Sequence, residues 1–220
     1  MKENQQIRKE DIKAVFDSPY IKVADIQYAP GRHYYDATRR DMEELIAVKS
    51  DEEFRTMLPD AVSCIVILCT SGEEPKLLLS YEFRYPAGRY LLSVPAGLID
   101  KEDETEPDPI RCATVREIKE ETGLDVTEKD LVFAVNPLLF STPGMTDESN
   151  ALVCAVLENP DLSVLSQEGA VGSEQFDGFA VLTREDALKV LREGRDGRGN
   201  FYPIYTWAAL SYFVSDAWKA

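Results

Sequence analysis

The chain has 220 residues, of which 44% are hydrophobic, and this is enough for one sizeable core with a small additional subdomain. Its 40 acidic residues outnumber 24 basic ones, and the formal net charge of −16 excludes the basic surface that neutralises a nucleic-acid backbone. We therefore expect no nucleic-acid partner, whereas a small phosphorylated ligand is compatible with this charge if divalent cations bind beside it.

The sequence also contains no membrane or export signal. No stretch approaches the roughly 18 uncharged apolar residues of a membrane span, and the first residues, MKENQQIRKED, contain no apolar signal core. The four cysteines lie singly, without C-x-x-C spacing, and are expected to be free thiols in a reducing compartment. We expect a cytoplasmic protein without membrane contact. His33 is the only histidine, so the chemistry must depend on carboxylates.

The first part of the chain predicts a small sheet of its own. Residues 21–28 and 33–40 read as strands joined by the turn at residues 29–32. After an acidic stretch, residues 61–70 form a continuous β-branched run typical of a buried central strand, with residues 76–85 as its expected partner. The predicted domains are an N-terminal β subdomain, residues 1–58, and a main domain, residues 59–220.

The remainder of the chain alternates between strands and helices. Pro109 is well placed for a helix start, and the spacing predicts a helix to Thr122 with Gly123 as its C-cap. Three further strands are expected at residues 131–140, 150–158 and 178–183. After them come an amphipathic helix at residues 184–194 and an apolar helical stretch at residues 202–218. This order predicts a mixed sheet with helices on its faces.

Three carboxylates share one face of the predicted helix. Glu117, Glu120 and Glu121 stand at i, i+3 and i+4, within a sector of about 80°. The apolar side chains are expected to point the other way and pack against the sheet: Cys112, Val115 and Ile118. Like charges at this spacing destabilise a helix, so the cluster needs either a cation or open solvent, with Arg116 and Lys119 as counter-charges. Hard oxygen ligands of this kind suit Mg²⁺ or Mn²⁺.

The segment from residue 95 to 124 resembles the Nudix box. That pattern is a Gly, five residues, a Glu, seven residues, then Arg-Glu-(aliphatic)-any-Glu-Glu-any-Gly-(aliphatic). Residues 116–124, REIKEETGL, match the second half at every fixed position. In the first half the loop after Gly97 is longer than the pattern, and Asp108 stands where the family has Glu. The resemblance implies a Nudix α/β/α sandwich with a mixed sheet, carrying the small N-terminal β subdomain.

The resemblance also implies roles for individual residues. Glu117 and Glu121 would be the principal metal ligands, Glu120 a further ligand or a supporting group, and Arg116 an ion-pair partner that orients a carboxylate. A backbone carbonyl ligand is expected from Ala96. Mg²⁺, or Mn²⁺, is the implied cofactor, which would polarise phosphoryl oxygens and lower the pKa of a bound water.

Two further stretches resemble the ADP-ribose pyrophosphatases of this family: EFRYPAGRY, residues 82–90, and STPGMTDE, residues 141–148. Arg84 would contact phosphates, a task for which a planar guanidinium is well suited. Glu148 is a candidate for substrate binding. Tyr35 occupies the place of an aromatic platform for the nucleobase, although ordinary cross-strand packing is an equal alternative.

The family takes a catalytic base or a further ligand from a loop after the box. Glu174 matches best, with Glu168 in reserve, and a solvated loop carboxylate is the alternative for both. The resemblance predicts a homodimer that cleaves the pyrophosphate of a nucleoside diphosphate linked to a second group, with ADP-ribose, giving AMP and ribose 5-phosphate, as the first choice. Other nucleoside diphosphate sugars and oxidised nucleoside diphosphates are alternative substrates. A catalytically silent nucleotide-binding regulator is the alternative from another class, against which the intact carboxylates argue.

Overall fold

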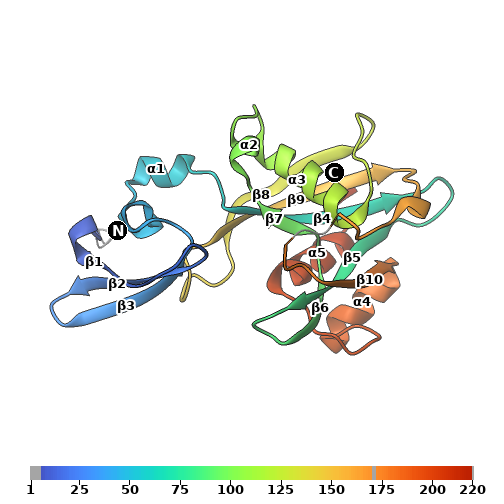
Figure 1. Cartoon of the computed structure of the whole chain (residues 1–220). Coiled ribbons are helices and arrows are strands. Elements are labelled where there is room, and N and C mark those ends of the chain that lie inside the picture. Colours follow the sequence, from blue (N-terminus) through green and yellow to red (C-terminus); the bar gives the residue numbers. More distant parts are fainter. Residues whose placement is uncertain (1–5, 170–171, 220) are drawn as a thin grey trace. The chain divides into compact units, whose positions relative to one another are not determined.

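The strands of the chain form two separate sheets in the computed structural model, which describes residues 6–169 and 172–219 (Figure 1). The chain divides into two compact units, Met1–Asp60 with Phe140–Ser149, and Ala61–Leu139 with Asn150–Ala220. The first unit therefore includes a segment that is distant in sequence from the rest of it. Within the described residues, no helix combines the length and the apolar character needed to cross a bilayer.

The first unit contains a three-stranded antiparallel sheet in the order β1-β2-β3. Its strands are β1 (Ile12–Asp17), β2 (Lys22–Ala29) and β3 (Arg32–Thr38). The last two confirm the predicted hairpin, whereas β1 was not predicted, because nearly all of its residues are exposed and leave no buried face to read. Helix α1 (Asp51–Thr56) forms in the acidic stretch, where Ser50 and Glu53 make a capping box.

The second unit contains the mixed seven-stranded sheet. Its main path is β10-β5-β4-β9-β8, with β6 paired to β5 and β7 paired to β4, and the central pair β4 and β9 is parallel. The strands are β4 (Ala61–Cys69), β5 (Lys76–Arg84), β6 (Arg89–Ser93), β7 (Ala96–Leu98), β8 (Leu131–Phe140), β9 (Ser149–Glu158) and β10 (Phe176–Leu182).

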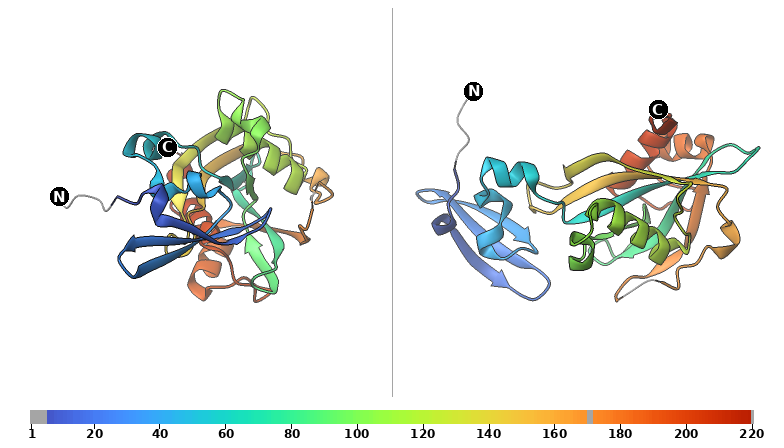
Figure 2. Two further views of the ribbon diagram at one scale, coloured as in Figure 1. Left: turned by 60° about the vertical axis from the view of Figure 1, so that its left-hand side comes forward. Right: turned by 90° about the horizontal axis from the view of Figure 1, so that it is seen from above.

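Helices cover both faces of this sheet (Figures 1 and 2). They are α2 (Lys101–Glu104), α3 (Pro109–Thr122), α4 (Arg184–Glu193) and α5 (Ile204–Val214), with short 3₁₀ turns at Lys9–Asp11, Met42–Glu44, Ile46–Val48, Leu162–Val164 and Ala217–Lys219. Side chains of β4 alternate between the two cores: Val62, Cys64 and Val66 pack with α3, while Ile65 and Ile67 pack with α4 and α5. The predicted α/β/α architecture is confirmed.

Helix α3 has the boundaries that the sequence predicts. Pro109 is its first residue, where its missing N–H is not needed, and the Asp108 side chain accepts a hydrogen bond from the Arg111 N–H at 3.1 Å. Gly123 ends the helix with a φ of 76°, and a side chain there would collide with the Val164 carbonyl. These two ends fix the length and the register of the helix that carries the acidic cluster.

Candidate active site

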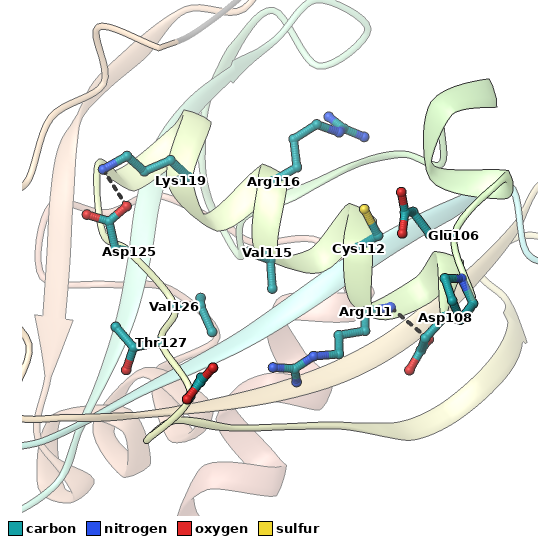
Figure 3. Close-up of a pocket in the computed structure, with 12 residues that line it drawn as sticks. Glu106, Asp108, Arg111, Cys112, Val115, Arg116, Lys119, Asp125, Val126 and Thr127 are labelled. Atoms are coloured by element: carbon teal, nitrogen blue, oxygen red, sulfur yellow. Dashed lines mark hydrogen bonds and ion pairs between the residues drawn. The ribbon is translucent and has the colours of Figure 1, made fainter.

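Two of the three carboxylates of α3 lie on a face that packs against the sheet, whereas the prediction was that the opposite, apolar face does so. Glu117 and Glu121 are only 6% and 3% exposed, and they continue the buried stripe that begins at Ala113. Cys112 and Val115, expected to pack against the sheet, instead line a groove on the outer side of the helix (Figure 3). Only Ile118, of the three apolar residues, is buried as predicted. The helix is rotated about its axis relative to the prediction, because the stripe of Ala113, Glu117 and Glu121 meets the strands.

The outer groove is distinct from the carboxylate cluster. It has a volume of about 710 Å³ and lies between α3 and the segment 125–128. Lys119 reaches Asp125 at 2.9 Å along its rim, and Val115 and Val126 lie inside it (Figure 3). Glu117 and Glu121 do not line it.

Glu121 is a buried carboxylate with one satisfied oxygen. Its Oε1 accepts a hydrogen bond from the Ala96 N–H of β7 at 3.1 Å, while its buried Oε2 has no hydrogen-bond partner in the part of the chain that the structure describes. Burial raises the pKa of Glu121 well above its ordinary value, and the charges of Glu82, Glu117 and Glu174 raise it further against the effect of the Ala96 N–H. A cation or a proton is needed to satisfy this group.

Glu117 lies directly against the backbone of β7. A Cβ atom on Gly97 would overlap the Glu117 carboxylate, so a larger residue there would displace this side chain. Burial raises the pKa of Glu117 to about 7, and the nearby Glu120 and Glu174 add to this, whereas Arg116 opposes it. Arg116 Nη1 lies 2.7 Å from Glu117 Oε1 and 3.2 Å from Glu120 Oε2, so it does hold two of the predicted carboxylates.

Asp103 completes the surroundings of Arg116 and was not selected from the sequence. Arg116 Nη2 donates to Asp103 Oδ2 and to the Leu98 carbonyl, both at 2.8 Å, and Asp103 is 3% exposed. Burial opposes ionisation of Asp103, yet the Arg116 hydrogen bond holds its pKa below the ordinary value. Five residues separate Gly97 from Asp103, which is the spacing of the family pattern. Asp103 therefore fits that position better than Asp108, whose side chain caps α3 instead.

Strand β5 brings two further charged groups to the same cluster. Glu82 is 9% exposed, and its Oε1 lies 2.8 Å from Nη1 of Arg84, whose side chain is 44% exposed. Burial raises the pKa of Glu82, and the charge of Glu174 raises it further. Glu82 was missed in the sequence, although its i, i+2 spacing from Arg84 puts both side chains on one face of the strand.

Of the two loop carboxylates, Glu174 is the one beside the cluster. Its charge raises the pKa values of Glu82, Glu117 and Glu121. The next residue is fixed to β5, since the carbonyl of Gln175 accepts a hydrogen bond from the Phe83 N–H at 2.8 Å. Glu168 is exposed, with its N–H bound to the Ser166 hydroxyl.

Two predicted substrate-binding residues belong to the first unit. Tyr35 on β3 is 57% exposed, while the hydroxyl of its neighbour Tyr34 donates to the Gly144 carbonyl at 3.0 Å. Glu148 forms an ion pair with Arg39 at 2.9 Å. Their assignment to the substrate stays a prediction.

The donor set suits a divalent cation. Carboxylate oxygens are hard ligands, and Glu121 Oε2 is a buried acceptor that such an ion would satisfy. Among the described residues no three acidic, histidine or cysteine groups already converge as a metal cluster, while Arg116 pairs with Glu117 and Glu120. Glu117 and Glu121 nevertheless place negative charge beside Gly97 and Ala96, and Glu82 and Glu174 are near enough to raise the pKa of Glu121. A cation would relieve this repulsion.

Comparison with known proteins identifies the relatives of this chain. The model of the NUDIX domain matches residues 57–204. The ADP-ribose pyrophosphatase of Bacillus subtilis is 29% identical over 154 residues, 70% of this chain and 71% of that protein. The ADP-sugar pyrophosphatase of Mus musculus is 30% identical over 129 residues, 59% of this chain and 55% of that protein. A solved structure titled as an ADP compounds hydrolase has the same fold, with a TM-score of 0.58 at 16% identity over 99% of this chain and 96% of that one.

Proposed function

This chain belongs to the Nudix family and is a pyrophosphohydrolase enzyme, and we propose that it hydrolyses ADP-ribose to AMP and ribose 5-phosphate. The observation that carries the proposal is the meeting of buried carboxylates from α3 and β5 around residues 96 and 97, with Arg84 half exposed beside them. The relatives named for activity on ADP-ribose and ADP-sugars support the choice of substrate.

We assign the divalent cation, Mg²⁺ or alternatively Mn²⁺, to Glu117, Glu121 and Glu120, together with the Ala96 carbonyl. When bound there, such a cation supplies polarisation of the phosphoryl oxygens and neutralisation of the diphosphate charge. Arg116 acts on the acids and not on the substrate, since its guanidinium is occupied by Glu117, Glu120 and Asp103.

The other residues bind the substrate and move a proton. Arg84 contacts the phosphates, and Glu174 accepts the proton of the water that attacks phosphorus. The new P–O bond forms as the bridging P–O bond breaks, and the second phosphate leaves with its electron pair. Tyr35 stacks on the adenine and Glu148 contacts the substrate.

A catalytically silent nucleotide-binding regulator is the second candidate. It is disfavoured because buried acids without a cation repel an anionic ligand and also cost folding free energy. Other nucleoside diphosphate sugars and oxidised nucleoside diphosphates are the alternative substrates for the same chemistry.

We propose a cytoplasmic homodimer formed through the first unit. Large apolar side chains are exposed on its sheet and turn: Val15, Phe16, Tyr20 and Ile21. The four cysteines are all free, which supports a reducing compartment. Light scattering during gel filtration measures the molecular mass of the protein in solution. The mass of a single chain, 24.7 kDa, would contradict the proposed homodimer.

The test is release of AMP from ADP-ribose by the purified protein with Mg²⁺, in parallel with UDP-glucose, ADP-glucose and an oxidised guanosine diphosphate. Fast cleavage that EDTA abolishes, and that is restricted to ADP-ribose, is the expected result. The Glu121→Gln variant should be nearly inactive, while Glu128→Gln, an acid in the outer groove, should retain activity. Preference for another diphosphate would replace the substrate, and absence of cleavage of all of them would favour the silent regulator.

A further inference from the structure

Glu82 is a buried acid whose only ion-pair partner in the described chain is a more exposed arginine two residues away. The Glu82 side chain is 11% exposed, that of Arg84 is 44% exposed, and Nη1 lies 2.8 Å from Oε1. Such a charge-assisted hydrogen bond limits the rotamers that a long, flexible arginine can adopt. The ion pair therefore determines where the guanidinium lies at the edge of the carboxylate cluster.

The backbone that carries this pair is itself held in place. Phe83, between the two residues, points to the opposite face, where its ring packs edge-to-face with Tyr85 at 5.2 Å and Tyr90 at 5.4 Å. Its N–H donates to the Gln175 carbonyl at 2.8 Å, and β6 pairs with β5 on the other side. With the strand fixed, the position of the guanidinium depends mainly on Glu82.

The location of Glu82 is unfavourable for a residue that only stabilises the fold. Glu82 lies among Glu121, Glu117 and Glu174, and the buried hydroxyl of Ser80, on the same face of β5, has no partner among the described residues. A neutral side chain here would remove repulsion between the acids and would also repel an anionic substrate less. An acid at this position needs a compensating contact, and the ion pair that the described residues offer it is the one with Arg84.

We propose that Glu82 is a positioning residue of the substrate site, which fixes the guanidinium of Arg84 for contact with the phosphates of a nucleoside diphosphate. The inference rests on the proposed function, because it takes Arg84 as the phosphate contact. The two possible effects of Glu82 have opposite signs. If Glu82 acted only through its charge, its removal would strengthen binding of an anion, whereas loss of a positioning contact weakens it.

The test is a double-mutant cycle on the binding of ADP with saturating Mg²⁺, measured by isothermal titration calorimetry. We expect Glu82→Ala to weaken binding about tenfold and Glu82→Gln, which keeps the acceptor oxygen and the shape, about threefold. In the Arg84→Ala background, Glu82→Ala should have no further weakening effect, since there is no guanidinium left to position. Glu73→Ala, which removes an exposed partner of Lys76, is the matched control and should bind ADP like the wild type.

Several outcomes would overturn the inference. They are tighter or unchanged ADP binding by both Glu82 variants, an equal weakening with and without Arg84, and no measurable ADP binding by the wild type with Mg²⁺. Titration with Mn²⁺ is a separate measurement, in which Glu82→Gln and the wild type should bind the same number of Mn²⁺ ions per chain. A lost Mn²⁺ ion would instead make Glu82 a metal ligand and overturn the positioning role.

Failure of the inference can be distinguished from failure of the proposed function. Binding of ADP needs no turnover of ADP-ribose, so a positive cycle with no cleavage of ADP-ribose would refute the function alone. Cleavage of ADP-ribose without coupling between the two residues would refute the inference alone. Thermal melting of each variant checks that it is folded. If Glu82→Ala does not fold, Glu82→Gln replaces it in the cycle.

Discussion

Replacing Glu121 by glutamine should make the metal-free protein more stable while abolishing its activity. In EDTA the wild type buries a carboxylate with one unpartnered oxygen, beside three other acids. Glutamine keeps the shape and the acceptor for the Ala96 N–H, but carries no charge. It also supplies an amide group that can donate to neighbouring carboxylates.

The size of the effect can be worked out from the cluster. The pKa of Glu117 is raised from 4.5 to about 7, and at about 1.36 kcal/mol per unit this corresponds to roughly 3 kcal/mol. The pKa values of Glu117 and Glu121 are both higher in the folded protein than in the unfolded chain. The folded protein therefore binds more protons, and its free energy of unfolding falls as the pH rises. For Glu117 this loss occurs between about pH 4.5 and 7, and for Glu121 it extends to higher pH. Removing one charge should restore about 1–3 kcal/mol at pH 8.5, the cost of one unsatisfied buried group.

Urea unfolding in EDTA at pH 5.5 and 8.5 measures this effect. We expect Glu121→Gln to be more stable than the wild type at pH 8.5 and to lose less stability between the two pH values. Glu120→Gln is the matched control on the same helix, and since this side chain is 36% exposed its stability should change by less than about 0.5 kcal/mol. A Glu121→Gln protein that is less stable than the wild type at pH 8.5, or that keeps the full pH dependence, would refute the reasoning.

Two further substitutions test the supports of the cluster. Asp103→Asn should destabilise the protein by about 1–3 kcal/mol and lower kcat, because Arg116 loses its buried partner. Asp100 is exposed, and its Oδ2 lies 3.4 Å from Arg116 Nη2. Asp100→Asn should therefore have little effect in the same unfolding and turnover assays. Gly97→Ala should reduce kcat by more than tenfold, because its methyl group displaces the Glu117 carboxylate; wild-type turnover would exclude this contact.

The sequence predicts best those features that are encoded locally. Pro109 and Gly123 are a start and a stop signal, so the limits of α3 were predicted correctly. The unbroken apolar run of β4 predicted a strand that is buried on both faces, as the structure shows. Strand β1 has no such signal, since its stability comes from pairing with β2 and not from a buried face of its own.

The errors concern the directions in which side chains point. Polarity favoured the apolar stripe of α3 as the one that meets the sheet, so Val115 was placed in the core and the acids on the opposite face, whereas in the structure Glu117 and Glu121 are buried. Glu82 went unnoticed for a related reason. The alternation of β5 puts it on the same face as Arg84, but only the position of α3 on the sheet brings that face to the carboxylate cluster.

Burial of the acids connects the stability of the unit with cation binding. Glu117 and Glu121 lie in the same helical stripe as Ala113, so the groups that would bind the cation also anchor α3 on the sheet. A cation at one hundred times its Kd would stabilise the folded state by about 2.7 kcal/mol. That is close to the roughly 3 kcal/mol that the shifted pKa of Glu117 represents. Cation binding can therefore offset the destabilisation that the buried acids cause in the metal-free protein. In the Glu121→Gln variant, added Mg²⁺ should raise the melting temperature less than in the wild type.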